Sequence, residues 1–100
     1  MPSIIIPAHN EESVIERTLR AVLADEIPDL EIVVVVNATT DRTAEIARDL
    51  DSRITVIETS TPGKTNALNL GEKTMKAFPR VFLDADITFK PGTLAAILTA

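Results

Sequence analysis

Two aspartates at the end of an apolar run are the residues of this chain best suited to chemistry. Phe82 and Leu83 are followed by Asp84, Ala85 and Asp86. In an extended backbone, side chains two residues apart lie on the same side, so both carboxylates would point in one direction. Neighbouring acids repel each other unless a cation lies beside them, and their oxygens suit Mg2+ or Mn2+, which usually also carry substrate phosphates. The alternative is a pair of acids in a surface turn, where aspartate is common.

The residues around these aspartates predict alternating strands and helices. Apolar, β-branched runs predict strands over residues 3–6, 30–36, 53–58 and 80–83. Apolar residues at helical spacing predict helices over residues 11–23, 41–50, 64–77 and 91–98. Asn10 is expected to cap the first helix, and Asp41 to cap or charge the start of the second. This alternation predicts a three-layer, Rossmann-like α/β fold whose parallel sheet has the strand order 3-2-1-4.

Polar residues follow three of these strands at what should be one edge of the sheet. They occupy positions 8–10, 37–41 and 84–86. In a doubly wound sheet, ligands bind outside the carboxyl ends of the strands, where the direction of winding reverses. That reversal lies between the first and the fourth strand here. The three clusters therefore predict a single binding site.

Composition narrows the classes of function. The chain has 100 residues, of which 45% are hydrophobic and 25% charged, and this predicts one globular domain. A net charge of −5 without a run of Lys or Arg argues against a nucleic-acid surface. There is no cysteine, so disulfides and thiolate metal sites are excluded. The start of the chain lacks a leader pattern, and the longest apolar run, residues 32–36, is too short to cross a bilayer.

Four segments, in order, resemble the motifs of one enzyme family. Residues 6–12 (IPAHNEE) are similar to its PA(Y/H)NEE opening, and residues 34–43 (VVVNATTDRT) to its VVDDGSTDGT segment. Residues 63–71 (GKTNALNLG) resemble its GKxxALNxG segment, and residues 83–86 (LDAD) its DxD motif. The family is that of the family 2 inverting glycosyltransferases, which includes cellulose, chitin and hyaluronan synthases. Its fold is GT-A, whose first half has the strand order expected above.

The resemblance implies a UDP- or GDP-linked sugar donor bound with Mg2+ or Mn2+, and transfer to an acceptor hydroxyl. The nucleotide-sugar-binding residues that it implies are Pro7, Ala8, His9, Glu11, Asn37, Lys64, Asp84, Ala85 and Asp86. Asp86 would be the main metal ligand, with Asp84 beside it on the ribose or sugar side. Lys64 would approach the nucleotide or its diphosphate. The metal would neutralise charge that develops on the diphosphate leaving group.

Two departures from the family pattern matter. Val36 and Asn37 stand where the family has one or two aspartates; the Asn37 amide oxygen can accept a hydrogen bond from a base N–H but carries no charge. The family's second half, which holds the acceptor site and the general base, has no counterpart here. We therefore expect residues 1–100 to form the donor-binding domain without the C-terminal acceptor half, and assign no catalytic residue. We expect a cytoplasmic protein, with any contact to the cytoplasmic face of a membrane made through other segments.

Plain structural roles are the alternatives for single residues. His9 is then a turn residue, Lys64 an exposed lysine at a helix start, and Glu11 a complement to a helix dipole. For the whole chain, the alternatives are a non-catalytic or degenerate nucleotide-sugar-binding module and a nucleotidyltransferase-like α/β enzyme. An open sheet edge in so short a chain also predicts self-association or limited stability.

Overall fold

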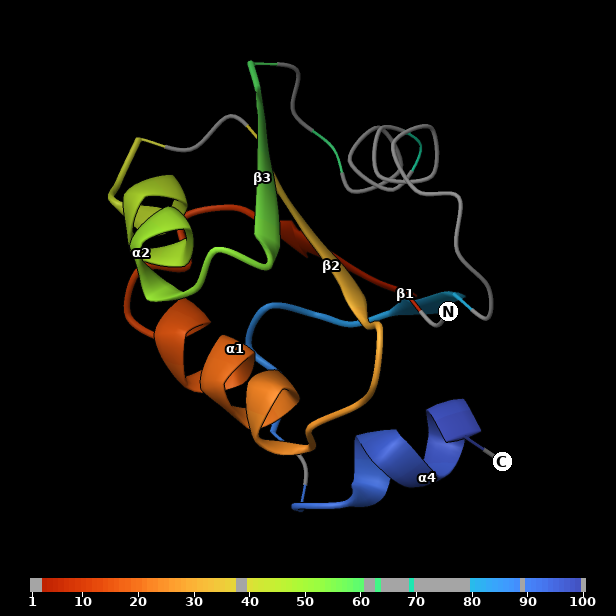
Figure 1. Ribbon diagram of the computed structural model, residues 1–100. Coiled ribbons are helices and arrows are strands. Elements are labelled where there is room, and N and C mark those ends of the chain that lie inside the picture. Colours follow the sequence, from red (N-terminus) through yellow and green to blue (C-terminus); the bar gives the residue numbers. More distant parts are fainter. Residues whose placement is uncertain are drawn as a thin grey trace.

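The computed structural model describes residues 3–37, 40–60, 63, 69, 80–88 and 90–99. The elements in chain order are β1 (Ser3–Ala8), α1 (Ile15–Ala24), β2 (Glu31–Asn37), α2 (Thr43–Leu50), β3 (Ile54–Thr59), β4 (Arg80–Phe82) and α4 (Thr93–Thr99). The four strands form one parallel sheet in the order β3-β2-β1-β4, which confirms the predicted fold class and strand order (Figure 1). The helix predicted over residues 64–77 lies outside the described residues, except for Asn69, which is helical.

Both faces of the sheet are buried. One face packs against α1, α2 and α4 in a single apolar cluster that includes Ile6, Val34, Leu19, Ala47 and Leu94. The opposite face buries a smaller cluster of Ile5, Val33 and Val35, with Ile57 packed against it. A strand that is buried on both faces cannot alternate with polar residues, and this explains the unbroken apolar run of β2. No helix in the described part of the chain is both long and apolar enough to cross a membrane.

The first strand is longer than predicted, because Pro7 does not end it. β1 continues to Ala8, and Pro7 stands opposite Val35 of β2. On its other side β1 pairs with β4 only as far as Ile5, whose carbonyl accepts a hydrogen bond from the Leu83 N–H at 3.0 Å. The backbone N–H and C=O groups of alternate residues in a strand point to the same neighbouring strand. The Pro7 nitrogen therefore points, like the Ile5 backbone groups, toward the β4 side, where pairing has already ended. A missing N–H is tolerated there, as at a sheet edge.

The start of α1 also differs from the prediction, because Asn10 does not cap it. Asn10 has a positive φ of 51°, and its side-chain oxygen accepts a hydrogen bond from the Thr40 N–H at 3.0 Å. The helix begins at Ile15, after a turn in which the Val14 and Ile15 N–H groups donate to the Glu11 carbonyl. Asparagine adopts left-handed backbone more readily than most residues. Asn10 therefore connects the loops that follow β1 and β2.

The last helix is held by an acid far away in the sequence. Asp25, which follows α1, accepts hydrogen bonds from the Gly92 N–H at 2.8 Å and the Ala95 N–H at 3.0 Å. The bond from Gly92, aided by that from Ala95, lowers the pKa of the Asp25 carboxyl despite some desolvation. These N–H groups have no partner inside a helix, so the carboxylate satisfies them and ties α4 to the end of α1 (Figure 1).

Candidate functional site

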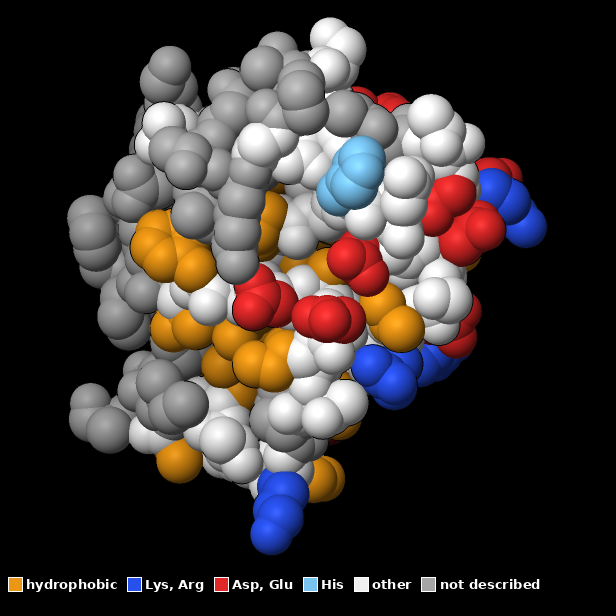
Figure 2. Space-filling model, turned by 180° about the vertical axis from the view of Figure 1, so that it is seen from behind, with side chains coloured by type: hydrophobic (Ala, Val, Ile, Leu, Met, Phe, Trp, Pro, Cys, Tyr) orange, Lys and Arg blue, Asp and Glu red, His pale blue; other side chains and the backbone are white. Residues whose placement is uncertain are grey.

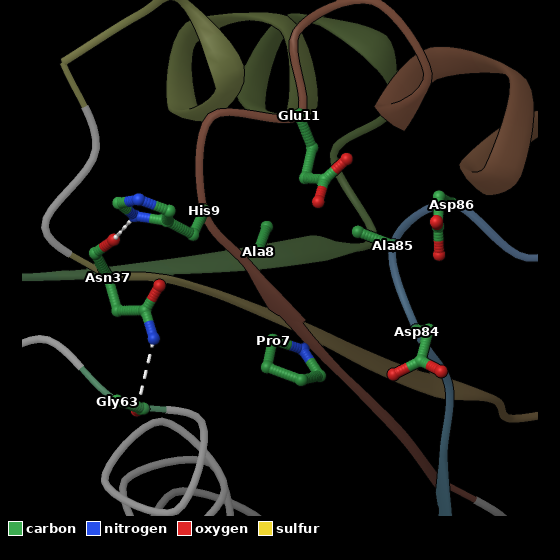
Figure 3. Close-up of a pocket in the computed structure, with 9 residues that line it drawn as sticks. All are labelled: Pro7, Ala8, His9, Glu11, Asn37, Gly63, Asp84, Ala85 and Asp86. Atoms are coloured by element: carbon green, nitrogen blue, oxygen red, sulfur yellow. Dashed lines mark hydrogen bonds between the residues drawn. The ribbon is translucent and has the colours of Figure 1, made fainter.

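A pocket of about 390 Å³ opens at the carboxyl ends of β1, β2 and β4. This volume lies within the range of roughly 300–1,000 Å³ typical of small-molecule sites. Its described lining residues are Pro7, Ala8, His9, Glu11, Asn37, Gly63, Asp84, Ala85 and Asp86 (Figure 3). Eight of the nine residues named from the sequence are thus brought together. The ninth, Lys64, lies outside the described residues.

Gly63 is the one described lining residue that the sequence reasoning did not name as a site residue. Its φ of +113° belongs to the left-handed region that favours glycine, and a Cβ at this position would meet no atom within 4 Å. The signal that could have identified it was its place at the head of the segment 63–71, from which only Lys64 was selected.

Two hydrogen bonds fix one wall of the pocket. The His9 Nδ1 lies 2.8 Å from the main-chain carbonyl oxygen of Asn37. Because a carbonyl oxygen can only accept a hydrogen bond, Nδ1 carries the hydrogen. The Asn37 Nδ2 donates to the Gly63 carbonyl at 3.0 Å. Asn37 is 5% exposed, so its amide is held in a largely desolvated position. His9 therefore has a structural hydrogen bond as well as a place in the pocket wall.

A network of hydrogen bonds ties the loop after β1 to the start of α2. The Thr43 hydroxyl accepts a hydrogen bond from the Glu11 N–H at 2.9 Å and donates to the Asp41 carboxylate. The same carboxylate accepts from the N–H groups of Thr43 at 3.0 Å and Glu12 at 3.2 Å. Burial alone would raise the pKa of Asp41, but these hydrogen bonds lower it. The structural role predicted for Asp41 at the helix start is confirmed, and the network fixes the backbone of Glu11.

The aspartate segment after β4 alternates between the core and the pocket. Leu83 and Ala85 are 9% and 3% exposed, whereas Asp84 and Asp86 are exposed and line the pocket. Both aspartates therefore line one pocket, as predicted, although Ala85 and Asp86 lie in a turn and not in the extended backbone from which that arrangement was inferred. Figure 3 shows the Glu11 side chain pointing toward the same space from the loop after β1. In the space-filling view, acidic side chains gather next to the single histidine (Figure 2).

Two side chains of helix α1 donate hydrogen bonds to the backbone of the aspartate segment. The Thr18 hydroxyl donates to the Ala85 carbonyl at 2.6 Å, and the Arg17 Nη2 donates to the Asp86 carbonyl at 3.4 Å. Sequence reasoning did not connect either residue with the site. For Thr18, the signal was a hydroxyl on the apolar face of a helix, because a buried hydroxyl must find a partner.

The carboxylates suit a hard divalent cation. The residues that the structure describes contain no group of three or more His, Cys, Asp or Glu side chains that could hold a metal ion by themselves. Mg2+ commonly takes one or two carboxylates and completes its coordination with water and substrate phosphates. The chemistry of Asp84 and Asp86 therefore fits Mg2+ or Mn2+ held jointly with a phosphate-bearing ligand.

The family model, the related sequences and the similar structures all point to glycosyltransferases. The sequence matches Glycosyl transferase family 2 over residues 3–100. A Bacillus subtilis protein called uncharacterized glycosyltransferase EpsJ is 38% identical over 87 residues, which are 84% of this chain and 25% of the relative. The mannosyltransferase PcManGT of Pyrobaculum calidifontis, solved with GDP-Man and Mn2+, is 29% identical with a TM-score of 0.87 over 95% of this chain and 30% of its own.

The same fold occurs in TarS of S. aureus. Its fragment 1–349, solved with UDP, is 25% identical with a TM-score of 0.88 over 98% of this chain and 31% of its own. The structural neighbours are GT-A glycosyltransferases. The chain spans 25%, 19% and 12% of the length of three curated relatives. With a family match over 98 of its 100 residues, the resemblance noted in the sequence is confirmed, and the chain belongs to glycosyl transferase family 2.

Proposed function

We propose that this chain binds a nucleoside-diphosphate sugar together with Mg2+ or Mn2+ and serves inverting transfer of the sugar to an acceptor hydroxyl. The observation that carries the proposal is one pocket at the sheet edge in which Asp84 and Asp86 face His9 and Asn37. The solved relatives support it: PcManGT was solved with GDP-Man and Mn2+, and TarS with UDP and with UDP-GlcNAc.

The two sides of the pocket would bind different parts of the donor. Pro7 and Ala8 give an apolar surface suited to a base and ribose, with His9 beside them. Asp86 would be the main metal ligand, and Asp84 would lie on the ribose or sugar side. When bound, the metal would supply charge neutralisation for the diphosphate leaving group.

Asn37 would contribute to recognition of the base. Its Nδ2 donates to the Gly63 carbonyl, which fixes the orientation of the amide, and an amide oxygen is an acceptor that suits a base N–H. Uracil and guanine both have such an N–H. An amide in place of the family's acid keeps the hydrogen-bond acceptor and removes the negative charge.

Calorimetric titration of UDP and of GDP, with and without Mn2+, tests the proposal. We expect binding that requires Mn2+, is lost in Asp86→Asn and is retained in Asp49→Asn, which changes an exposed acid of α2 outside the pocket. Failure of a chain with a normal circular dichroism spectrum to bind either nucleotide would refute donor binding. Much tighter binding of UTP or GTP than of the diphosphates would instead indicate nucleotidyl transfer.

A further inference from the structure

The aspartate segment has little regular backbone pairing of its own. β4 ends at Phe82, and the last ladder contact, from the Leu83 N–H to the Ile5 carbonyl, precedes both aspartates. Beyond it, the Ile87 N–H donates to the Asp84 carbonyl at 3.2 Å and closes a turn. Contacts from outside the segment must therefore hold the positions of the two carboxylates.

Helix α1 supplies those contacts. The Thr18 hydroxyl lies 2.6 Å from the Ala85 carbonyl and 3.4 Å from the Ile87 carbonyl, and Arg17 reaches the Asp86 carbonyl between them. Together with the turn, the carbonyls of residues 84, 85 and 86 accept hydrogen bonds, and those of residues 85 and 86 are bonded from α1. The Thr18 hydroxyl has one hydrogen, which the much shorter distance assigns to the Ala85 carbonyl, so the 3.4 Å contact with the Ile87 carbonyl is a secondary one.

Of these contacts, the one from Thr18 is the best protected. Thr18 is 0% exposed and Ala85 is 3% exposed, so their hydrogen bond is shielded from water, whereas Arg17 is exposed. Leaving a buried carbonyl or hydroxyl without its partner costs more than an exposed bond would contribute. A threonine within a helix often bonds back to its own helix, but this hydroxyl is instead directed at a segment 67 residues away.

We propose that Thr18 is a positioning residue of the donor site: its hydroxyl holds the Ala85 carbonyl and thereby sets where the Asp84 and Asp86 carboxylates lie. Ala85 lies between the two acids, so a shift or rotation of its peptide unit moves both side chains. Thr18 itself does not line the pocket. The consequence for metal and nucleotide binding rests on the proposed function; the backbone anchoring does not.

The test compares Thr18→Val, which removes the hydroxyl at nearly constant shape, with Thr18→Ser, which keeps it. Val22→Ala is the matched control, because Val22 is equally buried on α1 and has no hydroxyl to offer the segment. Two quantities are measured for each variant of the 100-residue chain: amide exchange at Ile87 by NMR, and UDP or GDP affinity in the presence of Mn2+.

We expect Thr18→Val to weaken Mn2+-dependent nucleotide affinity by about tenfold, in the range found when partners that orient metal ligands are removed. Ile87 exchange should become faster in this variant, while Thr18→Ser and Val22→Ala stay near the wild type in both measurements. Equal losses in Thr18→Val and Val22→Ala would show general destabilisation and overturn the proposal.

Failure of the proposed function gives a separate result. If the wild type binds neither nucleotide, the rate of Ile87 amide exchange still tests whether Thr18 anchors the backbone of the aspartate segment. Faster exchange in Thr18→Val but not in Val22→Ala supports the anchoring, and unchanged exchange overturns it.

Discussion

The pocket is built in opposite ways on its two sides. On the β1–β2 side, the protein's own groups bond to each other: His9 to the Asn37 carbonyl, Asn37 to the Gly63 carbonyl, and Glu11 through Thr43 to Asp41. On the β4 side, the backbone is anchored on α1 but the carboxylates are exposed. Within the described part of the chain, no hydrogen bond or ion pair reaches the Asp86 carboxylate.

This difference indicates two kinds of binding surface. The β1–β2 wall is preorganised, so binding a base there would require little reordering of the protein. The β4 side places two like charges near each other, which favours a cation between or beside them. We infer that the protein completes the first side itself and that metal and diphosphate complete the second.

The largest effect is expected on nucleotide affinity, and it should differ between the two aspartates. Asp86→Asn should weaken Mn2+-dependent nucleotide binding at least about a hundredfold, because loss of one partner in a close charge pair costs several kcal/mol. Asp84→Asn should cost only about tenfold if Asp84 contacts the ribose or sugar. Calorimetry on both variants measures this, and circular dichroism should show both folded, since the side chains are exposed. Equal effects would remove the proposed division of roles.

On the other side, Thr43→Val should lower the free energy of unfolding by about 2 kcal/mol, since it leaves the Glu11 N–H without its partner and removes a donor from Asp41. Urea unfolding measures the change. Thr55→Val, at an exposed position of β3, serves as control and should change stability little. A neutral result for Thr43→Val would contradict a preorganised β1–β2 wall.

Away from the pocket, Asp25→Ala should lower stability by about 1 kcal/mol through loss of the α4 cap. Because the folded-state pKa of Asp25 is lowered from 3.8, its contribution is complete above that pH and disappears as pH falls through the lowered value. Unfolding experiments at pH 7 and pH 3 should therefore show a smaller difference between variant and wild type at the lower pH. A constant difference would argue against a charged cap.

The smallest effect on stability is expected at the outer strand. Phe82 is 47% exposed on β4, the last strand of the described sheet. If this surface drives self-association, Phe82→Ser should raise the monomer fraction in light-scattering chromatography while leaving the melting temperature nearly unchanged. Unchanged oligomers in the variant would place self-association elsewhere.

Local patterns in the sequence were sufficient for the sheet and most of the pocket. The apolar run of β2 indicated burial on both faces, and the two aspartates separated by one alanine indicated acids that line a common site, although a turn and not an extended strand holds them there. Parallel strands then bring their carboxyl ends to one rim, which is why eight of the nine named residues meet there.

Three of the misses have one physical cause: a polar side chain that could bond locally bonds to a distant part of the chain instead. Asn10 had the sequence of a cap but bonds to Thr40, thirty residues away. Asp25 caps a helix 67 residues away, and Thr18 bonds to Ala85 across the same separation. A polar side chain can satisfy itself locally or across the fold, and only the packed structure decides which partner lies within reach.

Coupling between metal and nucleotide tests the central inference most directly. Free Mn2+ is read from its paramagnetic resonance signal while the chain is titrated with and without UDP or GDP. We predict weak binding of Mn2+ alone and at least about tenfold tighter binding with nucleotide, because the two ligands complete the same side of the pocket and must affect each other's affinity equally. Mn2+ binding of the same strength with and without nucleotide would contradict the account.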